Sequence, residues 1–272
     1  MPKSSPLALI GWWRDALRAG GTGGLNWHLH ALSSRRAWQG TVALIDQFLD
    51  ATRPNSDHLL LIGPSAGWML PTRWLTRFKR IDAFDIDPLA SVLFARLHGH
   101  GLRESSTAWQ FTRLDAIAHL PKLLKAHPHA CVWFDNVLGQ LRYRMDDEDL
   151  LEQQIGLIRD MLQDRSWGSL HDLYSGPVSR DPDTDVKALA TTWTCLDPTP
   201  DGTPRVQLAG QGLTLESGTQ HLLQSVQAEG VWQDHATAGV FPVGTPIRLI
   251  PWRFRQRYWH WLGAAWVSGR GA

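Results

Sequence analysis

The chain has few cysteines and tyrosines and almost no net charge. Its 272 residues include two cysteines and three tyrosines, and the formal net charge is +1. Cys131 and Cys195 show no metal-ligand spacing and do not resemble a disulfide framework, which favours a reduced, cytoplasmic location. The near-neutral charge gives no strong nucleic-acid signal, because such binding needs a basic excess or a clustered basic face.

Long apolar runs are also missing. No stretch approaches the roughly 18 apolar residues of a membrane span, so we expect none. The first twenty residues hold only a short apolar run, interrupted by charge and without a small-residue cleavage site, which argues against a signal peptide. With 43% hydrophobic and 19% charged residues, the sequence predicts a sizeable globular core.

Tryptophan is abundant, with fifteen residues. We expect most of them to pack in the core, and Trp-rich surfaces leave open a homo-oligomer or a protein partner. The aromatic stretch PWRFRQRYWHWL (251–262) allows base stacking with phosphate contacts, an amphipathic membrane-surface strip, or a strand. The alternation of arginines with aromatics favours the strand, and we expect Pro251 to interrupt it.

Three regions follow from the pattern of apolar residues. Residues 1–55 predict an N-terminal helical lid for substrate recognition, with Asn26 capping a helix that runs on past Trp38 to Leu49. Residues 56–176 predict a Rossmann-like cofactor-binding core. Residues 177–272 predict an insertion, rich in Pro, Gly, Asp and Thr, followed by C-terminal strands that complete the sheet.

The core prediction depends on five short apolar runs that alternate with amphipathic stretches. The runs are HLLLIG, RIDAFD, AWQFTRLD, ACVWFDN and SWGSLHDLYSG, between residues 58 and 176. Such alternation is typical of an α/β fold with a mostly parallel Rossmann-like sheet and helices on both faces.

Small or acidic residues follow four consecutive runs, at the strand ends where open parallel sheets bind ligands. The first turn, IGPSAGW, has glycine at 63 and 67 and serine at 65, which is two matches of three to a G-x-G-x-G loop. A dinucleotide fingerprint would need glycine at 68, where Trp68 stands, and a Walker loop would need lysine. The turn therefore favours a nucleoside ligand without a pyrophosphate.

With these motifs, residues 58–175 resemble the class I S-adenosylmethionine-dependent methyltransferases. The resemblance implies that S-adenosylmethionine is the cofactor and that its methionyl part lies against the glycine loop. It implies roles for the following residues: Gly63, Ser65 and Gly67 at the methionyl part, Asp85 with its neighbour Ile86 at the ribose, Asp115 and Ala116 at the adenine, and Asp135 and Asn136 beside the methyl group. From the residues alone, Asp87 is an alternative ribose ligand, and Asp115 an alternative helix cap.

The resemblance implies methyl transfer to an unidentified small-molecule or peptide acceptor. Asp135 and His171 are the catalytic candidates, because a histidine near a strand end has the right pKa range for a general base. Leu61 and Ser65 depart from the family pattern and keep open an inactive scaffold or partner subunit; an NAD-dependent reductase is disfavoured by Trp68. The histidine pairs at 28/30, 98/100 and 127/129 lack a completing ligand, so no metal site is expected.

Overall fold

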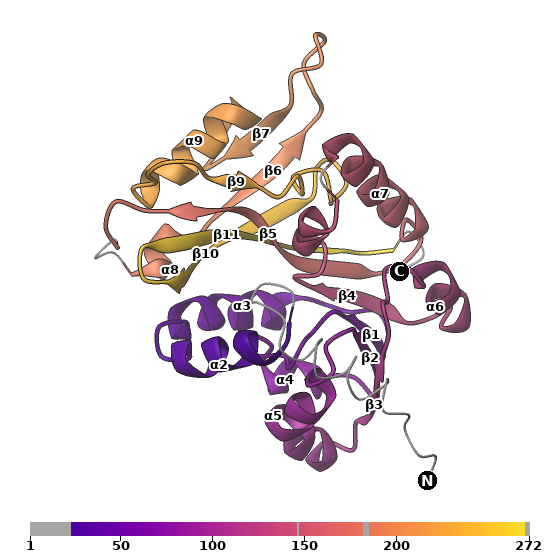
Figure 1. Cartoon of the computed structure of the whole chain (residues 1–272). Helices are drawn as coiled ribbons and strands as arrows, with labels where there is room; N and C mark the ends of the chain where they lie inside the picture. Colours follow the sequence, from indigo (N-terminus) through magenta and orange to yellow (C-terminus); the bar gives the residue numbers. More distant parts are fainter. Residues whose placement is uncertain (1–22, 146, 182–184, 270–272) are drawn as a thin grey trace.

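One continuous sheet with helices on both faces forms the protein (Figure 1). The computed structural model describes residues 23–145, 147–181 and 185–269. The strands are β1 (His58–Ile62), β2 (Arg80–Asp85), β3 (Ala108–Arg113), β4 (Cys131–Asp135), β5 (Trp167–Pro177), β6 (Thr191–Leu196), β7 (Arg205–Leu208), β8 (Gln211–Thr214), β9 (Gln233–Asp234), β10 (Pro246–Arg255) and β11 (Tyr258–Val267). The helices are α2 (Leu25–Ser34), α3 (Gln39–Ala51), α4 (Thr72–Leu75), α5 (Ala90–Glu104), α6 (Leu120–Ala126), α7 (Glu148–Met161), α8 (Val186–Leu189) and α9 (Leu215–Ser225), with a 3-10 helix η1 (Gly139–Tyr143).

The strands lie in the order β3-β2-β1-β4-β5-β11-β10-β6-β7-β8, and β9 pairs with β5. Strands β1 to β5 are parallel, and the strands beyond β5 are antiparallel. The predicted Rossmann-like sheet with helices on both faces is confirmed. Its strand order reverses between β1 and β4, which is where open α/β sheets bind their ligands.

Two apolar cores lie on opposite faces of the sheet. One lies under α6, α7 and α9 and includes Leu120, Leu151 and Leu222; the other lies under α2 to α5 and includes Ala31 and Phe94. Central strands are therefore buried on both sides, which explains why the run of β1 is apolar without alternation.

Most tryptophans serve this packing, as the sequence suggests. Eight of those in the described residues are at most 2% exposed: Trp38, Trp74, Trp133, Trp167, Trp193, Trp252, Trp259 and Trp261. Such large side chains bury 150–250 Å² each, so they contribute heavily to both cores.

The N-terminal segment forms two helices rather than one. The predicted continuous helix capped by Asn26 is wrong, because α2 begins at Leu25 after Gly24 and the chain turns between Ser34 and Gln39. The part of the predicted lid before residue 23 lies outside the described residues. The helices are attached to the C-terminal hairpin, since the Trp38 indole donates to the carbonyl of Phe254 at 3.1 Å.

The C-terminal aromatic stretch is a hairpin of two long strands, β10 and β11. The expectation that Pro251 interrupts it is wrong. The pairing of β10 with β6 ends at Leu249. No described strand pairs with that edge of β10 at Pro251, so the N–H that proline lacks would have no strand partner there. The predicted alternation holds in part. Trp252 is buried, and Arg255 is exposed, 4.9 Å from the ring centre of Tyr258, but the register shifts between Arg253 and Arg255, and Arg257 lies in the turn after the strand.

The sheet runs without interruption from the predicted core into the region after residue 177. The division into 1–55, 56–176 and 177–272 as functional units stays a prediction.

Two glycine substitutions should change stability in opposite directions. Gly67 has φ +71°, and an added Cβ would lie 2.6 Å from His98 Nε2, so Gly67→Ala should lower the free energy of unfolding by about 2 kcal/mol. Gly156 lies inside α7 with no atom within 4 Å of an added Cβ, so Gly156→Ala should raise it by about 0.5–1 kcal/mol. Urea denaturation of both variants measures the two effects. A lower free energy of unfolding in both variants, or a higher one in both, contradicts this packing.

Candidate active site

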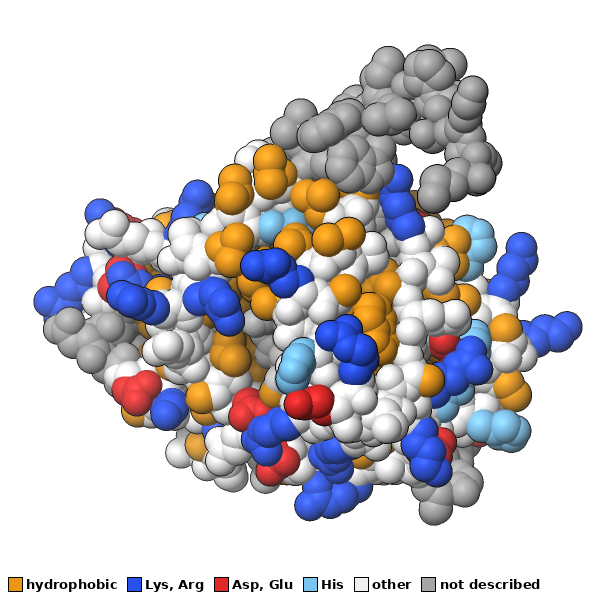
Figure 2. Space-filling model, turned by 90° about the horizontal axis from the view of Figure 1, so that it is seen from below, with side chains coloured by type: hydrophobic (Ala, Val, Ile, Leu, Met, Phe, Trp, Pro, Cys, Tyr) orange, Lys and Arg blue, Asp and Glu red, His pale blue; other side chains and the backbone are white. Residues whose placement is uncertain are grey.

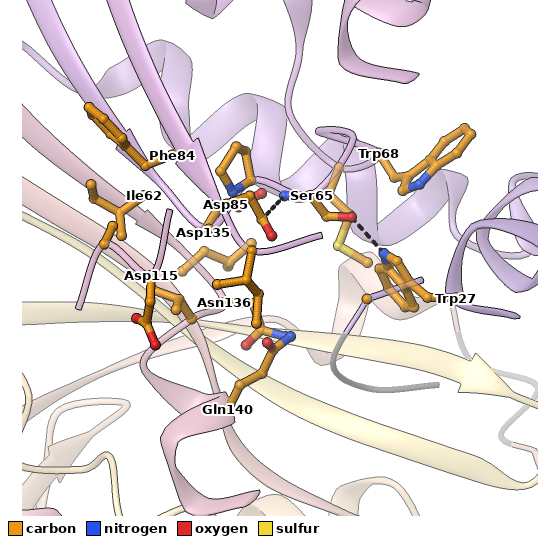
Figure 3. A pocket seen from close by; sticks show the side chains of 18 of the residues that line it. Trp27, Ile62, Ser65, Trp68, Phe84, Asp85, Asp115, Asp135, Asn136 and Gln140 are labelled. Atoms are coloured by element: carbon orange, nitrogen blue, oxygen red, sulfur yellow. Dashed lines mark hydrogen bonds between the residues drawn. The ribbon is translucent and has the colours of Figure 1, made fainter. Parts of the chain in front are cut away.

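A pocket opens at the carboxyl ends of β1, β2 and β4, beside the reversal of strand order (Figure 3). It holds about 850 Å³ of empty space, part of it continuous with open solvent. Eight of the nine residues expected to bind the cofactor line it: Gly63, Ser65, Asp85, Ile86, Asp115, Ala116, Asp135 and Asn136. Gly67 is not among the lining residues.

The glycine loop between β1 and α4 has an unusual backbone. Gly63, Ser65 and Gly67 have φ values of +69°, +50° and +71°, so every second residue is left-handed. That conformation explains the spacing of small residues, because it is costly for a residue with a Cβ. Ser65, which has a Cβ, adopts this strained backbone conformation beside the pocket; such strained residues are frequent at functional sites.

Asp85 holds the loop against the end of β2. Its Oδ2 accepts a hydrogen bond from Ser65 N at 2.6 Å, and its Oδ1 accepts one from Asp87 N at 2.8 Å. Burial raises the pKa of Asp85 to about 6. Each carboxylate oxygen can accept a second hydrogen bond, so capacity for a ligand hydroxyl remains.

Asp87, the alternative ribose ligand, is occupied elsewhere. It is 4% exposed and does not line the pocket. Its Oδ2 accepts from Gly24 N at 2.7 Å and contacts His28 Nε2 at 3.0 Å, and its Oδ1 accepts from Leu89 N at 2.8 Å. The structure thus brings Asp85 to the pocket and uses Asp87 to attach α2.

Two tryptophans connect α2 to the glycine loop. Trp68 Nε1 donates to His28 Nδ1 at 3.0 Å, which fixes His28 as the neutral tautomer that donates from Nε2 to Asp87. Trp27 Nε1 donates to Ser65 Oγ at 3.0 Å, and Trp27 lines the pocket (Figure 3). These contacts place the predicted lid segment over the glycine loop.

Asp135 ends β4 on the other side of the reversal point. Burial raises its pKa to about 7, and the nearby charge of Asp85 adds to the shift. The next residue, Asn136, is left-handed with φ +57° and is held by β5: its Nδ2 donates to Asp172 Oδ2 at 3.0 Å. The pocket therefore places two carboxyl groups with raised pKa values near each other, a feature that is frequent at functional sites.

Asp115 lies at the pocket but has two protein partners. Its Oδ2 pairs with Arg144 at 2.9 Å, and its Oδ1 accepts from Ala118 N at 3.4 Å. The second contact is the capping role considered as an alternative. Both oxygens retain a free lone-pair direction, so the carboxylate can still accept from an adenine amino group.

His171 is not brought to the pocket. It is 0% exposed, its Nδ1 bonds Ser169 Oγ at 2.9 Å, and its ring faces Phe241 in the opposite core. Burial lowers its pKa to about 3, so it stays neutral. Because successive strand residues alternate between faces, Leu170 lines the pocket instead.

The sequence reasoning missed several lining residues. Gln140 and Arg144 come from η1 and the turn after it, and Trp252 and Leu262 come from the C-terminal hairpin. No local motif marks Trp252 and Leu262, because the pairing of β11 with β5, which lies far earlier in the chain, brings the hairpin to the pocket.

One histidine cluster lies away from the pocket, at the amino ends of β1 and β2. His58, Asp82 and His127 have ligand atoms within 4.8 Å of one another, the only such group in the described residues. Arg80 already pairs with both oxygens of Asp82, at 2.9 and 3.3 Å. This positive charge opposes a bound cation, and the cluster is better described as a charge network.

The chain is similar in structure to several solved proteins at low sequence identity. No family model and no curated protein matches the chain. The chain is similar to a SAM-dependent methyltransferase from Anabaena variabilis (13% identity, 93% of this chain and 99% of that chain, TM-score 0.42). It is also similar to magnesium protoporphyrin IX methyltransferase from Synechocystis with bound SAM (12%, 94% and 90%, 0.39) and to the N-methyltransferase NodS from Bradyrhizobium japonicum with S-adenosyl-L-homocysteine (13%, 59% and 71%, 0.32). At TM-scores this low the likeness carries no conclusion about the chemistry of this chain.

The surface adds little to the choice of function. Among the described residues no helix has the length and apolarity needed to cross a membrane. On the face shown in Figure 2, lysine and arginine side chains are spread among other residues rather than gathered in one basic patch.

The raised pKa values predict how stability depends on pH. As pH rises from about 4 to about 7, the unfolded chain loses the protons of Asp85 and Asp135 first, so these two groups lower the free energy of unfolding over this range, while His171, which is buried neutral, raises it. Asp135→Asn removes one contribution and should be more stable than the parent by on the order of 2 kcal/mol at pH 8, with little difference at pH 4.

Urea unfolding at the two pH values measures this difference. Asp160→Asn, at an exposed residue of α7, is the matched control and should show no such gain. An equal effect of Asp135→Asn at both pH values would contradict the raised pKa.

Proposed function

We propose that this protein transfers a methyl group from S-adenosylmethionine to a small-molecule or peptide acceptor. The observation that carries the proposal is the convergence, at the reversal of strand order, of a left-handed loop with Asp85, Asp115 and Asp135 from three different strand ends. When bound, the cofactor supplies a methyl group that its positive sulfonium has already activated.

The pocket chemistry fits this cofactor. A ribose diol and an adenine amino group need hydrogen-bond acceptors, which the carboxylates supply. A sulfonium cation is favoured by negative charge, and it would in turn favour the ionised forms of Asp85 and Asp135, whose pKa values burial raises. The cationic side chain of the lining, Arg144, is paired with Asp115, so a pyrophosphate would find poor support.

We assign the residues accordingly. Asp85 and Ile86 hold the ribose, and Asp115 and Ala116 hold the adenine. The loop from Gly63 to Ser65 approaches the methionyl part with its backbone, and Asp135 and Asn136 lie beside the methyl group; Gly67 is left out, because it packs against His98 and does not line the pocket. His171 is left out, because it lies on the other face of the sheet.

The work of the chain is then to hold two reactants in line and to exclude water. Trp27 on α2, and Trp252 and Leu262 on the hairpin, line the pocket with apolar surface. We propose that these residues form the acceptor side, which gives the N-terminal and C-terminal regions a part in substrate recognition.

Titration calorimetry with S-adenosylmethionine, S-adenosylhomocysteine and NADH tests the proposal. The first two should bind with micromolar dissociation constants, and Asp85→Asn should weaken them at least tenfold, by about 1.4 kcal/mol, because it removes a charged acceptor. Asp160→Asn should leave them unchanged.

No binding of either S-adenosyl compound overturns the cofactor assignment and leaves a scaffold role. Binding of NADH alone would indicate a reductase instead.

A further inference from the structure

Asp172 and His260 form a buried hydrogen-bonded pair directly behind residues that line the pocket, although neither is itself a lining residue. Asp172 Oδ1 lies 2.7 Å from His260 Nδ1, and the two side chains are 4% and 9% exposed. Burial raises the pKa of Asp172, but the charge and hydrogen bond of His260 outweigh it and lower the pKa to about 2. Asp172 is therefore ionised at neutral pH.

This pair lies on the pocket face of the sheet. Asp172 is two residues beyond Leu170 on β5, His260 is two residues before Leu262 on β11, and both leucines line the pocket. Residues two apart on a strand share a face. Asn136, another lining residue, donates to Asp172 Oδ2 at 3.0 Å and so connects the pair to the end of β4.

Two buried polar atoms at this place lack a partner among the described residues: His260 Nε2 and Trp252 Nε1. The two residues are opposite each other in the β10–β11 register, with ring centres 4.9 Å apart, and Trp252 lines the pocket. Buried polar groups are nearly always hydrogen-bonded, so an unsatisfied pair beside a pocket points to a ligand group.

The protonation of the pair defines its chemistry. The ionised Asp172 accepts from His260 Nδ1–H, so once His260 Nε2 has lost its proton that nitrogen presents a lone pair. Trp252 Nε1 is a donor only. A hydroxyl group satisfies both, since it can donate to His260 Nε2 and accept from Trp252 Nε1.

We propose that His260 is the general base of the methyl transfer, that Asp172 is its positioning residue, and that the acceptor is a hydroxyl on an aromatic ring. The proposal rests on the proposed function. The hydroxyl oxygen bonds to the methyl carbon while the carbon–sulfur bond breaks, and the sulfur keeps the electron pair and becomes a neutral thioether. The hydroxyl proton moves to His260 Nε2, so the products are an aryl methyl ether, S-adenosylhomocysteine and an imidazolium.

The lining of the pocket favours this acceptor class. Trp27 and Trp252 present aromatic surface, with ring centres 6.4 Å apart in an edge-to-face arrangement, which suits a flat ligand. The ionised carboxylate of Asp172 opposes an anionic acceptor. A phenolic hydroxyl, with a pKa of about 10 as in tyrosine, is neutral on arrival and needs a base to remove its proton.

Histidine ring NMR tests ligand contact independently of turnover. In the complex with S-adenosylhomocysteine, phenol or catechol should shift the His260 ring resonances, which are assigned by their loss in His260→Gln. Anisole, whose oxygen carries no proton, should shift them much less. The resonances of His221, exposed on α9, should not move.

Transfer of labelled methyl from S-adenosylmethionine to catechol tests the catalytic role. His260→Gln should lower kcat by a factor of about 10² to 10⁴ and remove the acid limb of the pH–rate profile. Asp172→Asn should lower kcat and displace that limb, a change that a purely structural role would not produce. His221→Gln should leave the rate unchanged, and unaltered affinity for S-adenosylhomocysteine shows that each variant is folded.

Phenols that leave the His260 resonances unmoved overturn the proposal, as does a kcat for His260→Gln within threefold of the parent. Failure to bind S-adenosylhomocysteine overturns the proposed function instead. In that case the phenol titration of the free protein still decides whether the pair recognises a hydroxyl.

Discussion

The carboxylate of Asp85 is the constraint on which the pocket depends. By accepting from Ser65 N and Asp87 N it joins the loop after β1 to the end of β2 and stabilises the left-handed residues of that loop. The position of Ser65 in turn sets the hydrogen bond to Trp27, and the position of Asp87 sets the attachment of α2. One buried acid thereby connects the sheet, the loop and the helix that together enclose the site, and the cost of its burial appears as a raised pKa.

The parallel half of the sheet could be predicted from the sequence because its central strands are buried on both faces. Runs such as HLLLI and CVWFD are apolar without interruption, and acidic or small residues mark their ends. The antiparallel half was harder. Strands such as β8 are short and largely exposed, so they carry no continuous apolar run, and Pro251 is accommodated by an unpaired edge that only the tertiary pairing reveals.

The cofactor side and the acceptor side of the site differ in the same way in how far the sequence predicts them. Residues of the cofactor side follow strand ends directly, so their order along the chain brings them to one edge of the sheet. The acceptor side is assembled from α2, η1 and the hairpin, whose contacts depend on packing between distant segments. His171 and His260 illustrate the limit: both lie in aromatic strands, but only the register of β5 with β11 decides which histidine shares a face with the pocket. Nothing in the sequence indicates that His260 Nε2 has no hydrogen-bond partner among the described residues.

The most direct test of this account is a crystal structure of the protein with S-adenosylhomocysteine and catechol. The account predicts the nucleoside between the glycine loop and Asp85, the thioether sulfur beside Asp135, and the catechol hydroxyl within hydrogen-bond distance of His260 Nε2. A nucleoside bound elsewhere, with Asp85 retaining only its backbone partners, would contradict the central claim that this carboxylate organises a cofactor site.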